Sequence, residues 1–321
     1  MRVLITTTSF QDTPGEHHEL LDNMGWEVTT VRGPLGENDM LDLVGDFDAI
    51  ICGDDVYSRE VLEKARPKLR FLSKYGIGVD KIDVDAATEM GLPVFFTPGV
   101  NHTTVAEHVF GLMLAHFRQL IPSVNHTRAG EWKRLTGHEI MGKTLGILGL
   151  GRIGREVAMR AKAFDMPLMG YDIYWPEAFA NEYQIERVDH AETLLQEVDV
   201  LTLHCNLTEE TRDLLNERTL GSMKRGALIV NCARGEIVDT AAMVKALDNE
   251  QIGGYVTDVL DEEPPPSDHP LLNHPKCLCT PHIGSRTYES VVRQATKAIK
   301  NLELASNKQE PLAQVNEVPI S

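Results

Sequence analysis

The stretch "TLGILGLGRIGREVA", residues 144–158, limits what this chain can fold into more than any other part of the sequence. Apolar residues typical of a buried strand lead into Gly149, Gly151 and Gly154, and an amphipathic helical pattern follows at once. At this spacing the first glycine permits a tight turn, the second lets backbone amides approach a pyrophosphate, and the third lets helix and strand pack closely. The stretch therefore predicts a strand, a loop that binds phosphate groups, and a helix.

An acidic residue ends the next predicted strand, "PLMGYD", eighteen residues after Gly154. A carboxylate at this distance, here Asp172, accepts hydrogen bonds from an adenosine ribose 2′-hydroxyl and repels a 2′-phosphate. The glycines and Asp172 together predict NAD, rather than NADP, as the cofactor. The alternative for Asp172 is a purely structural role as a cap on the helix that follows the strand.

Short apolar runs alternate with amphipathic segments along the whole chain. A first series runs from "RVLITTT" to "PVFFT" and ends before residue 98, and a second series runs from "TLGILGL" to "CLCTP". This alternation is typical of parallel strands joined by crossover helices. We therefore expect an α/β protein with two doubly wound parallel-sheet domains and a break near residues 98–103.

The charge balance narrows the class of partner. With 31 Lys and Arg against 48 Asp and Glu, the net charge is −17, so the chain lacks the basic excess that neutralises the phosphates of a nucleic acid. No run of eighteen apolar residues is present, and "MRVLITTTSF" leads directly into a strand, so we expect a cytoplasmic protein without a membrane partner. The five cysteines lack the spacing of a metal site, and we expect free thiols and no metal.

Further motifs lie on both sides of the glycine-rich stretch. "LIVNCARGEIVD", "VTDVLDEEP" and "CTPHIGS" follow it, and "KYGIGVDKIDVDAA" and "TPGVNHTTVAEH" precede it. This ordered set resembles the NAD-dependent D-2-hydroxyacid dehydrogenases, most of all the catalytic part of D-3-phosphoglycerate dehydrogenases, and it covers nearly the whole chain. The resemblance implies an oxidoreductase that transfers a hydride between NAD(H) and a D-2-hydroxy acid or the matching 2-oxo acid.

The resemblance also implies a domain organisation. Residues 1–101 and 286–321 would form a flavodoxin-like substrate domain, and residues 102–285 a Rossmann NAD-binding domain, with the active site in the cleft. Residues 103–141 resemble the family's dimer-forming segment, so we expect a homodimer. Trp132 would then be an apolar anchor in the subunit interface, and the alternative is that it packs inside its own domain.

Three residues match the family's catalytic positions, namely Arg234, Glu263 and His282. Their chemistry agrees with this match. Histidine changes its charge near neutral pH, so it serves as the general acid/base for the hydroxyl proton. A carboxylate at the other ring nitrogen fixes the tautomer and favours the imidazolium. A guanidinium binds the substrate carboxylate and polarises the carbonyl group.

The remaining site residues are predicted largely from the resemblance. The "YGIGVD" segment would present the backbone amides of Gly76, Ile77 and Gly78 to the substrate carboxylate, and Asn101 would lie at the hinge. Beyond the glycines and Asp172, cofactor contacts are predicted for Val105, Arg152, Ile153, Cys205, Cys232 and Asp258.

Two positions depart from phosphoglycerate dehydrogenases. Lys74 stands where those enzymes commonly carry an arginine, and Glu89 stands where a basic residue would suit a phosphate. Lys74 still supplies one positive charge to the substrate, so a 2-hydroxy acid with a second anionic group is one alternative, and glyoxylate or hydroxypyruvate reductase activity is another. A non-catalytic NAD-sensing protein of the same fold is the alternative outside the enzymes.

Overall fold

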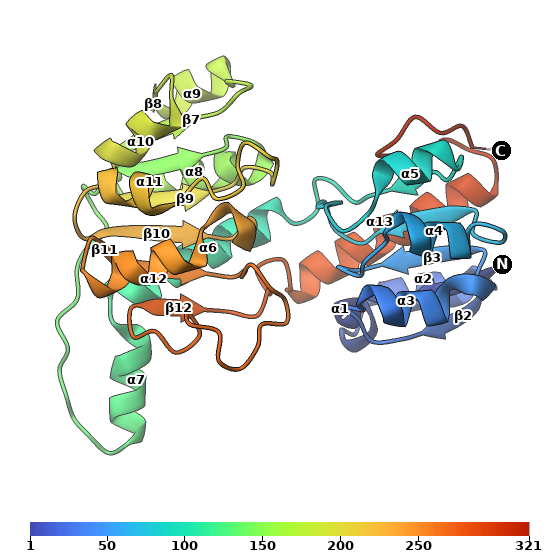
Figure 1. Cartoon of the computed structure of the whole chain (residues 1–321), viewed down its shortest axis with the longest axis horizontal. Helices are drawn as coiled ribbons and strands as arrows, with labels where there is room; N and C mark the ends of the chain where they lie inside the picture. The colour runs from blue at the N-terminus through green and yellow to red at the C-terminus, as the bar shows by residue number, and fades with distance from the viewer. Residues whose placement is uncertain (321) are drawn as a thin grey trace. The chain divides into compact units, whose positions relative to one another are not determined.

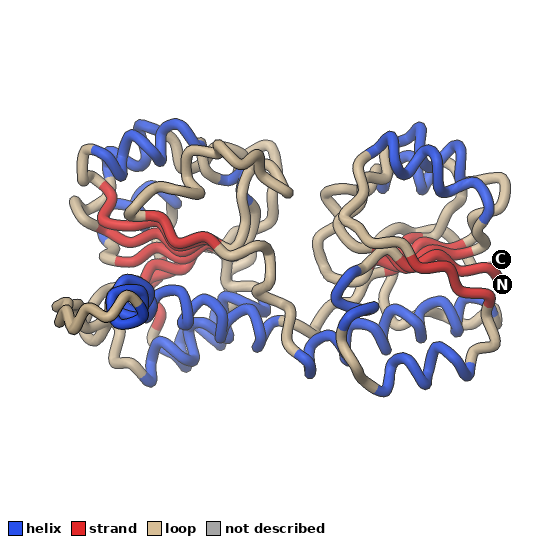
Figure 2. The backbone as a smooth tube through the Cα atoms, turned by 90° about the horizontal axis from the view of Figure 1, so that it is seen from below, coloured by secondary structure: helices blue, strands red, loops and turns tan. Residues whose placement is uncertain are grey.

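The computed structural model describes residues 1–320, which fold into two compact units. The first unit comprises residues 1–101 and the chain from residue 285 onward, and the second comprises His102–Gly284. Each unit is built on one parallel sheet with helices on both faces (Figure 1, Figure 2). The predicted α/β class with two doubly wound parallel-sheet domains is therefore confirmed.

The first unit contains a five-stranded sheet in the order β2-β1-β3-β4-β5. Its strands are β1 (Arg2–Ile5), β2 (Glu27–Thr30), β3 (Ala49–Cys52), β4 (Phe71–Lys74) and β5 (Val94–Phe95), all paired in parallel. The strands β3 and β4 are buried along their whole length because helices cover both faces of the sheet. This is the flavodoxin-like strand order, in which ligands bind beyond the carboxyl ends of the strands.

Helices on the two faces of this sheet divide the core of the first unit into two apolar clusters. One face carries α3 (Glu37–Leu43), the short 3₁₀ turn η1 (Val44–Asp46), α4 (Arg59–Ala65) and α5 (Val84–Glu89). The other face carries α1 (Thr8–Asp12), α2 (Glu16–Asn23) and α13 (Tyr288–Ser306).

The helix α13 brings the end of the chain back onto the first sheet. Its Ala298 and Ile299 are fully buried, and Ser73 Oγ on β4 donates a hydrogen bond to Ala298 O at 3.1 Å. A small residue at this position lets the helix backbone come close to the strand. The segment that follows runs beside β5, where Val94 N donates to Asn316 Oδ1 at 2.9 Å. The C-terminal segment thus covers an edge that would otherwise be open to pairing.

The second unit contains a seven-stranded sheet in the order β12-β11-β10-β9-β6-β7-β8, which follows the Rossmann order around its first strand. Its strands are β6 (Leu145–Leu148), β7 (Leu168–Tyr171), β8 (Ile185–Arg187), β9 (Val200–Leu203), β10 (Ala227–Asn231), β11 (Ile252–Thr257) and β12 (Cys277–Cys279). The sequence did not predict β8, because two of its three residues are exposed and polar and leave no apolar run.

The helices of the second unit also form two layers (Figure 2). The layer on one face contains α10 (Ala191–Glu197), α11 (Glu217–Ser222) and α12 (Thr240–Asp248), and a 3₁₀ turn η2 (Gly235–Ile237) precedes α12. The layer on the other face contains α6 (His102–Phe117), α8 (Arg152–Ala163) and α9 (Glu177–Tyr183).

An arm projects from the second unit after α6. That helix ends at Phe117 because Gln119 adopts a left-handed conformation with φ 52°, and α7 (Leu120–Arg128) then begins. None of the residues of α7 is buried, and α7 extends away from the sheet with the loop that follows it (Figure 1). Residues 120–141 are termed the arm. Its exposed large apolar side chains are Leu120, Ile121, Val124, Trp132 and Met141.

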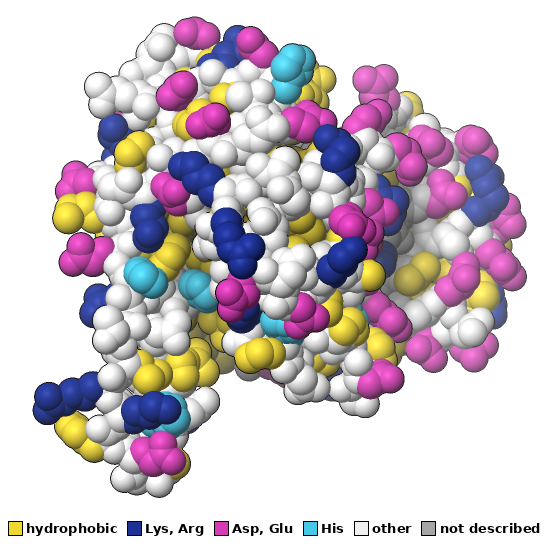
Figure 3. Space-filling view, turned by 60° about the vertical axis from the view of Figure 1, so that its left-hand side comes forward, with side chains coloured by type: hydrophobic (Ala, Val, Ile, Leu, Met, Phe, Trp, Pro, Cys, Tyr) yellow, Lys and Arg dark blue, Asp and Glu magenta, His cyan; other side chains and the backbone are white. Residues whose placement is uncertain are grey.

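Trp132 is 81% exposed, so the alternative that it packs inside its own domain is wrong. Figure 3 shows hydrophobic side chains next to basic ones on the surface of the arm. Among the residues that the structure describes, no helix combines the length and the apolar character that crossing a bilayer requires.

Candidate active site

The glycine-rich loop lies at the carboxyl end of β6. Gly149 adopts φ +98°, and a Cβ atom on it would lie 2.7 Å from the carbonyl carbon of His204. A Cβ atom on Gly154 would overlap the carbonyl oxygen of Gly149. Gly151 is the N-cap of α8, and no atom lies within 4 Å of the place where its Cβ would be. Two glycines therefore let the loop pack closely, and the third leaves open space in front of the helix.

The first turn of α8 offers donors to an anion. The amides of Arg152, Ile153 and Gly154 belong to this turn, where the N–H groups of a helix have no acceptor within the helix. The helix macrodipole adds a partial positive charge at the same end. Since Gly151 leaves the approach open, this end of the twelve-residue helix fits a pyrophosphate.

Asp172 lies beside the glycine-rich loop, one residue after β7. Its Oδ2 atom accepts a hydrogen bond from Leu150 N at 2.6 Å, and its Oδ1 atom accepts one from Tyr174 N at 2.7 Å. The carboxylate thus stabilises the turn that follows the strand, and it also borders the loop where a ribose would lie. The two roles proposed for Asp172 are compatible in this geometry.

Arg234 follows β10 on a backbone that is fixed on both sides. Buried Asn231 accepts from Ala233 N at 3.0 Å and donates from Nδ2 to Arg234 O at 2.9 Å. A Cβ atom on Gly235 would overlap the backbone of Leu260, so only glycine fits after the arginine. The Arg234 guanidinium donates to Ala233 O at 2.7 Å, and the side chain is partly exposed. The Arg234 backbone is therefore held in place, and its side chain is partly exposed at the carboxyl end of β10.

His282 and Glu263 form a hydrogen-bonded pair. His282 Nδ1 lies 2.6 Å from Glu263 Oε2, and Glu263 Oε1 accepts from Leu260 N at 3.1 Å. The two side chains are 34% and 31% exposed. His282 has φ 52°, a conformation that is uncommon outside glycine and that clusters at functional sites. Because the carboxylate binds Nδ1, the ring is oriented and Nε2 becomes the nitrogen for proton exchange.

A buried carboxylate holds the loop that carries His282. Asp258 is 2% exposed, and its Oδ1 atom accepts from Thr280 Oγ1 at 2.5 Å and from Ile283 N at 2.9 Å. Its Oδ2 atom accepts from Gly284 N at 2.6 Å. The amide of His282 donates to Asp258 O at 2.9 Å. Asp258 therefore binds the loop on both sides of His282.

His108 on α6 completes this network, and the sequence analysis did not identify it. Its Nε2 atom lies 2.9 Å from Thr280 Oγ1 and 3.3 Å from Asp258 Oδ1. Burial favours the neutral acid, but the hydrogen bonds from His108, Thr280 and the loop amides lower the pKa of Asp258 below its ordinary value of 3.8. The network is therefore built around an ionised carboxylate.

Three residues predicted to contact the cofactor are apolar in character. Burial raises the pKa of the Cys205 thiol to about 11 and that of the Cys232 thiol well above its ordinary range, so both remain protonated at neutral pH. Val105 on α6 is 6% exposed and presents little surface. These residues can offer van der Waals contact and no charge.

His204 lies next to the glycine-rich loop but is not suited to acid/base chemistry. Its Nε2 atom is 2.8 Å from Thr202 Oγ1, and its Nδ1 atom is buried without a hydrogen-bond partner in the described part of the chain. Burial lowers the pKa of His204 to about 3, so the ring is neutral at physiological pH.

The "YGIGVD" segment lies beyond β4 in the first unit. Gly76 N donates to Thr97 Oγ1 at 2.8 Å, and that hydroxyl lies 3.1 Å from Gly76 O, so this amide already has an acceptor. The amides of Ile77 and Gly78 donate to no other group within residues 1–320, and Ile77 is 39% exposed. Of the three amides predicted to bind the substrate carboxylate, these two have no acceptor in the described part of the chain.

Lys74 and Asn101 also belong to the first unit. The Lys74 side chain is 4% exposed, and its Nζ atom donates to Gly53 O at 2.5 Å and to Asp54 Oδ1 at 2.6 Å. Asn101 is 7% exposed and is the last residue before the second unit begins.

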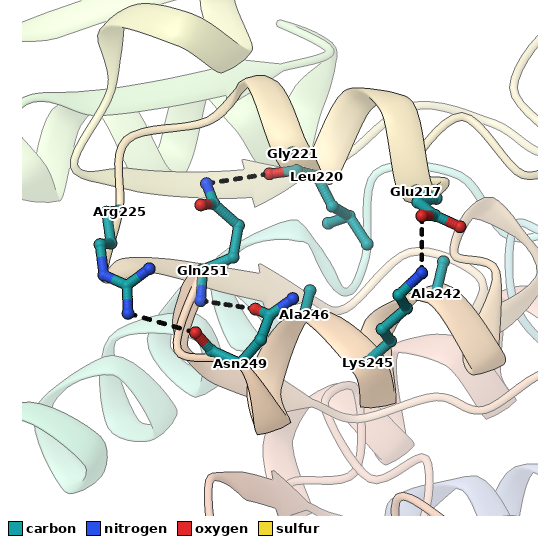
Figure 4. A pocket seen from close by; sticks show the side chains of 9 residues that line it. All are labelled: Glu217, Leu220, Gly221, Arg225, Ala242, Lys245, Ala246, Asn249 and Gln251. Atoms are coloured by element: carbon teal, nitrogen blue, oxygen red, sulfur yellow. Dashed lines mark hydrogen bonds and ion pairs between the residues drawn. The ribbon is translucent and has the colours of Figure 1, made fainter.

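A surface hollow between α11 and α12 is not the candidate active site (Figure 4). It lies at the amino ends of β10 and β11, since Arg225 stands two residues before β10 and Gln251 directly before β11, whereas ligands of such sheets bind at the carboxyl ends. Its charged side chains are paired with each other or with backbone, as in the 2.7 Å contact between Lys245 Nζ and Glu217 Oε1. No candidate catalytic residue lines it.

Comparison with known proteins agrees with the geometry. Residues 110–284 match the family model described as "D-isomer specific 2-hydroxyacid dehydrogenase, NAD binding domain". The D-3-phosphoglycerate dehydrogenase of Methanocaldococcus jannaschii is 39% identical over 316 residues, which cover 96% of this chain and 59% of that protein. The glyoxylate reductase of Thermofilum pendens is 38% identical over 296 residues, which cover 88% of this chain and 85% of that protein.

A solved structure shares the whole fold. The NAD-dependent formate dehydrogenase of Staphylococcus aureus in complex with NAD is 29% identical, with a TM-score of 0.86 over 99% of this chain and 100% of that one. This chain thus spans 59% of the length of the phosphoglycerate dehydrogenase but most of the length of the glyoxylate reductase.

Proposed function

The chain belongs to the D-isomer specific 2-hydroxyacid dehydrogenase family, and on this premise we propose that it transfers a hydride between NAD(H) and a D-2-hydroxy acid or the matching 2-oxo acid. The observation that carries the proposal is the pair of His282 Nδ1 and Glu263 Oε2, 2.6 Å apart in the same unit as the glycine-rich loop and Arg234. Reduction of a carbonyl group needs a proton donor, a group that stabilises the developing oxyanion and a hydride source.

The residues around the glycine-rich loop fit NAD. The amides of the first turn of α8 would bind the pyrophosphate, because Gly151 leaves their approach open. Asp172 would bind the ribose hydroxyls and repel a 2′-phosphate. When bound, the reduced cofactor supplies the hydride that adds to the carbonyl carbon of the substrate.

The protein's own side chains stabilise the developing negative charge and transfer the proton. Arg234 binds the substrate carboxylate and stabilises the negative charge that grows on the carbonyl oxygen. His282 delivers a proton from Nε2 to that oxygen, and Glu263 stabilises the imidazolium before the transfer. The amides of Ile77 and Gly78 bind the substrate carboxylate. One 2-oxo acid, one NADH and one proton thus give one 2-hydroxy acid and NAD⁺.

A turnover assay with NADH and a panel of small 2-oxo acids tests the proposal. The parent protein should oxidise NADH with at least one of them. His282→Ala should lower kcat by a factor on the order of 100 to 10,000, the usual contribution of general acid catalysis, while NADH binding measured by fluorescence titration is retained. A parent protein that binds NADH and reduces no 2-oxo acid would instead match the non-catalytic sensor.

We also propose that the protein is a homodimer assembled through the arm. The arm exposes five large apolar side chains in one segment, and a tryptophan that is 81% exposed is the kind of anchor that interfaces use. A cytoplasmic location is proposed on the ground that all five cysteines are free thiols, as a reducing compartment would keep them.

A further inference from the structure

Lys74 lies at the end of β4, directly before the segment whose Ile77 and Gly78 amides we propose to bind the substrate. Its side chain passes close to this segment, since a Cβ atom on Gly76 would lie 3.5 Å from Lys74 Cε. The charge of the Lys74 side chain should therefore influence the binding of an anion at the Gly76–Gly78 segment.

The ion pair between Lys74 and Asp54 is asymmetric in exposure. The Lys74 side chain is 4% exposed, whereas the Asp54 side chain is 49% exposed. The ammonium donates to Asp54 Oδ1 at 2.6 Å and to Gly53 O at 2.5 Å. The buried ammonium is thus paired with a carboxylate that is itself half exposed.

Hydrogen bonds to the neighbouring residue Asp55 hold the backbone around Asp54 in place. Asp55 is fully buried and accepts from Leu35 N at 2.8 Å and from Gly53 N at 3.1 Å. The hydroxyl of Thr6 also donates to Asp55 Oδ2. These bonds fix the backbone of the turn after β3, from which the Asp54 side chain reaches Lys74.

We propose that the Lys74–Asp54 pair selects the substrate class: 2-oxo acids with a small uncharged side chain are accepted, and those with a second anionic group are rejected. This inference rests on the proposed function. The lysine predicted to bind a distal phosphate, sulfonate or carboxylate is already paired with Asp54, so such a group would have to compete with that carboxylate for the ammonium. A hydrogen, methyl or hydroxymethyl side chain needs no cation and meets no such competition.

Two substrates that differ only by a phosphate test the proposal. We would measure kcat/KM with NADH for hydroxypyruvate and for 3-phosphohydroxypyruvate and take their ratio. The parent protein should favour hydroxypyruvate. Asp54→Asn keeps an oxygen for Lys74 Nζ but removes the negative charge, so the ratio should shift towards the phosphorylated substrate by about ten-fold or more, which corresponds to about 1.4 kcal/mol.

The first unit supplies a matched control. Asp46 also binds a lysine, with Asp46 Oδ1 2.6 Å from Lys68 Nζ, but it precedes β3 and therefore lies at the opposite edge of the sheet. Asp46→Asn removes the same charge and should leave the ratio within about two-fold, since surface pairs far from a site act weakly on it. Adding Lys74→Met to Asp54→Asn should cancel the gain, because the ammonium that would bind the phosphate is then absent.

The outcomes distinguish a failure of this inference from a failure of the proposed function. A parent protein that reduces hydroxypyruvate but prefers the phosphorylated substrate overturns the inference and leaves the proposed function standing. The inference is also overturned, and the proposed function left standing, if the ratio of the two kcat/KM values is the same in Asp54→Asn as in Asp46→Asn. If the parent protein reduces neither substrate nor any other 2-oxo acid, the proposed function fails and the inference fails with it. The substrate preference of the parent protein can overturn the inference even if a variant does not fold.

Discussion

Replacing Glu263 with glutamine removes the charge beside His282 without removing volume. The carboxylate oxygen lies 2.6 Å from His282 Nδ1, and an opposite charge this close shifts the protonation of a group by about 1–3 pH units. Because 34% of the His282 side chain and 31% of the Glu263 side chain are exposed, we take the lower end, about one pH unit or about 1.4 kcal/mol. Reduction requires protonated His282, so the fall in activity with rising pH should begin about one pH unit lower in Glu263→Gln.

The assay is the pH profile of kcat/KM for reduction of a 2-oxo acid by NADH in the parent and in Glu263→Gln. Asp248→Asn is a matched control, because Asp248 is the last residue of α12, away from the candidate site, and its carboxylate lies 3.3 Å from His274 Nε2. Its profile should match that of the parent. A Glu263→Gln profile whose high-pH limb is unchanged or moves upward would remove this pair from the mechanism.

Four further results follow from the same geometry. The parent should prefer NADH over NADPH by about 2 kcal/mol in kcat/KM, and Asp172→Ala should narrow this gap; equal use of both cofactors by the parent contradicts the assignment. The folded-state pKa of Asp258 lies below 3.8, so its charge stabilises the fold above the unfolded-state pKa, and this contribution is lost as the pH falls through the folded-state value. The free energies of urea unfolding of the parent and of Asp258→Asn should therefore differ near neutral pH and converge in acid. Folding lowers the pKa of His204 from 6.5 to about 3, so between these pH values His204 takes up a proton when the protein unfolds. The free energy of unfolding of the parent should therefore decrease by up to about 1.4 kcal/mol for each unit that the pH falls in this range, and His204→Gln should reduce this slope. Trp132→Ala should shift the protein from dimer to monomer in light scattering, whereas Tyr288→Ala, which removes a 70% exposed aromatic ring from the first unit, should not.

The sequence predicted those parts of the fold that local patterns determine. The glycines after β6 and the alternation of apolar runs with helical segments each act within a few residues, and the structure confirms the two parallel sheets that they imply. The break after Phe117 was not predicted, because Gln119 carries no local signal for its left-handed conformation. The three residues of β8 were missed for a similar reason, since their strand pairing depends on β7 and not on their own pattern.

The site was predictable where a residue type has a definite chemical task and not where its partner is distant in sequence. Glu263 and His282 are 19 residues apart and belong to separate motifs, and the chemistry of each pointed to the other. The contact between His108 and Thr280 spans 172 residues, and a lone histidine on a helix gives no sign of it. Lys74 was predicted from the sequence as a cation for the substrate, which stays a prediction. Its ion pair with Asp54 was not predicted, because it follows from the parallel pairing of β3 with β4, which places Cys52 opposite Lys74.

The same kind of pairing explains how the acid/base is positioned. The strands β11 and β12 pair in parallel with Thr257 opposite Cys279, so Asp258 and Thr280 leave the sheet side by side at its carboxyl edge. Asp258 can then bind the amides of the loop after β12 and stabilise the left-handed backbone of His282, a conformation that costs on the order of 1–3 kcal/mol. The connection between the two strands, residues 258–276 with a proline-rich part at 262–270, contributes Glu263 but does not determine the position of the histidine. Changes in the rest of that connection should therefore alter the surroundings of the site, while the register of β11 with β12 keeps the His282 backbone in place.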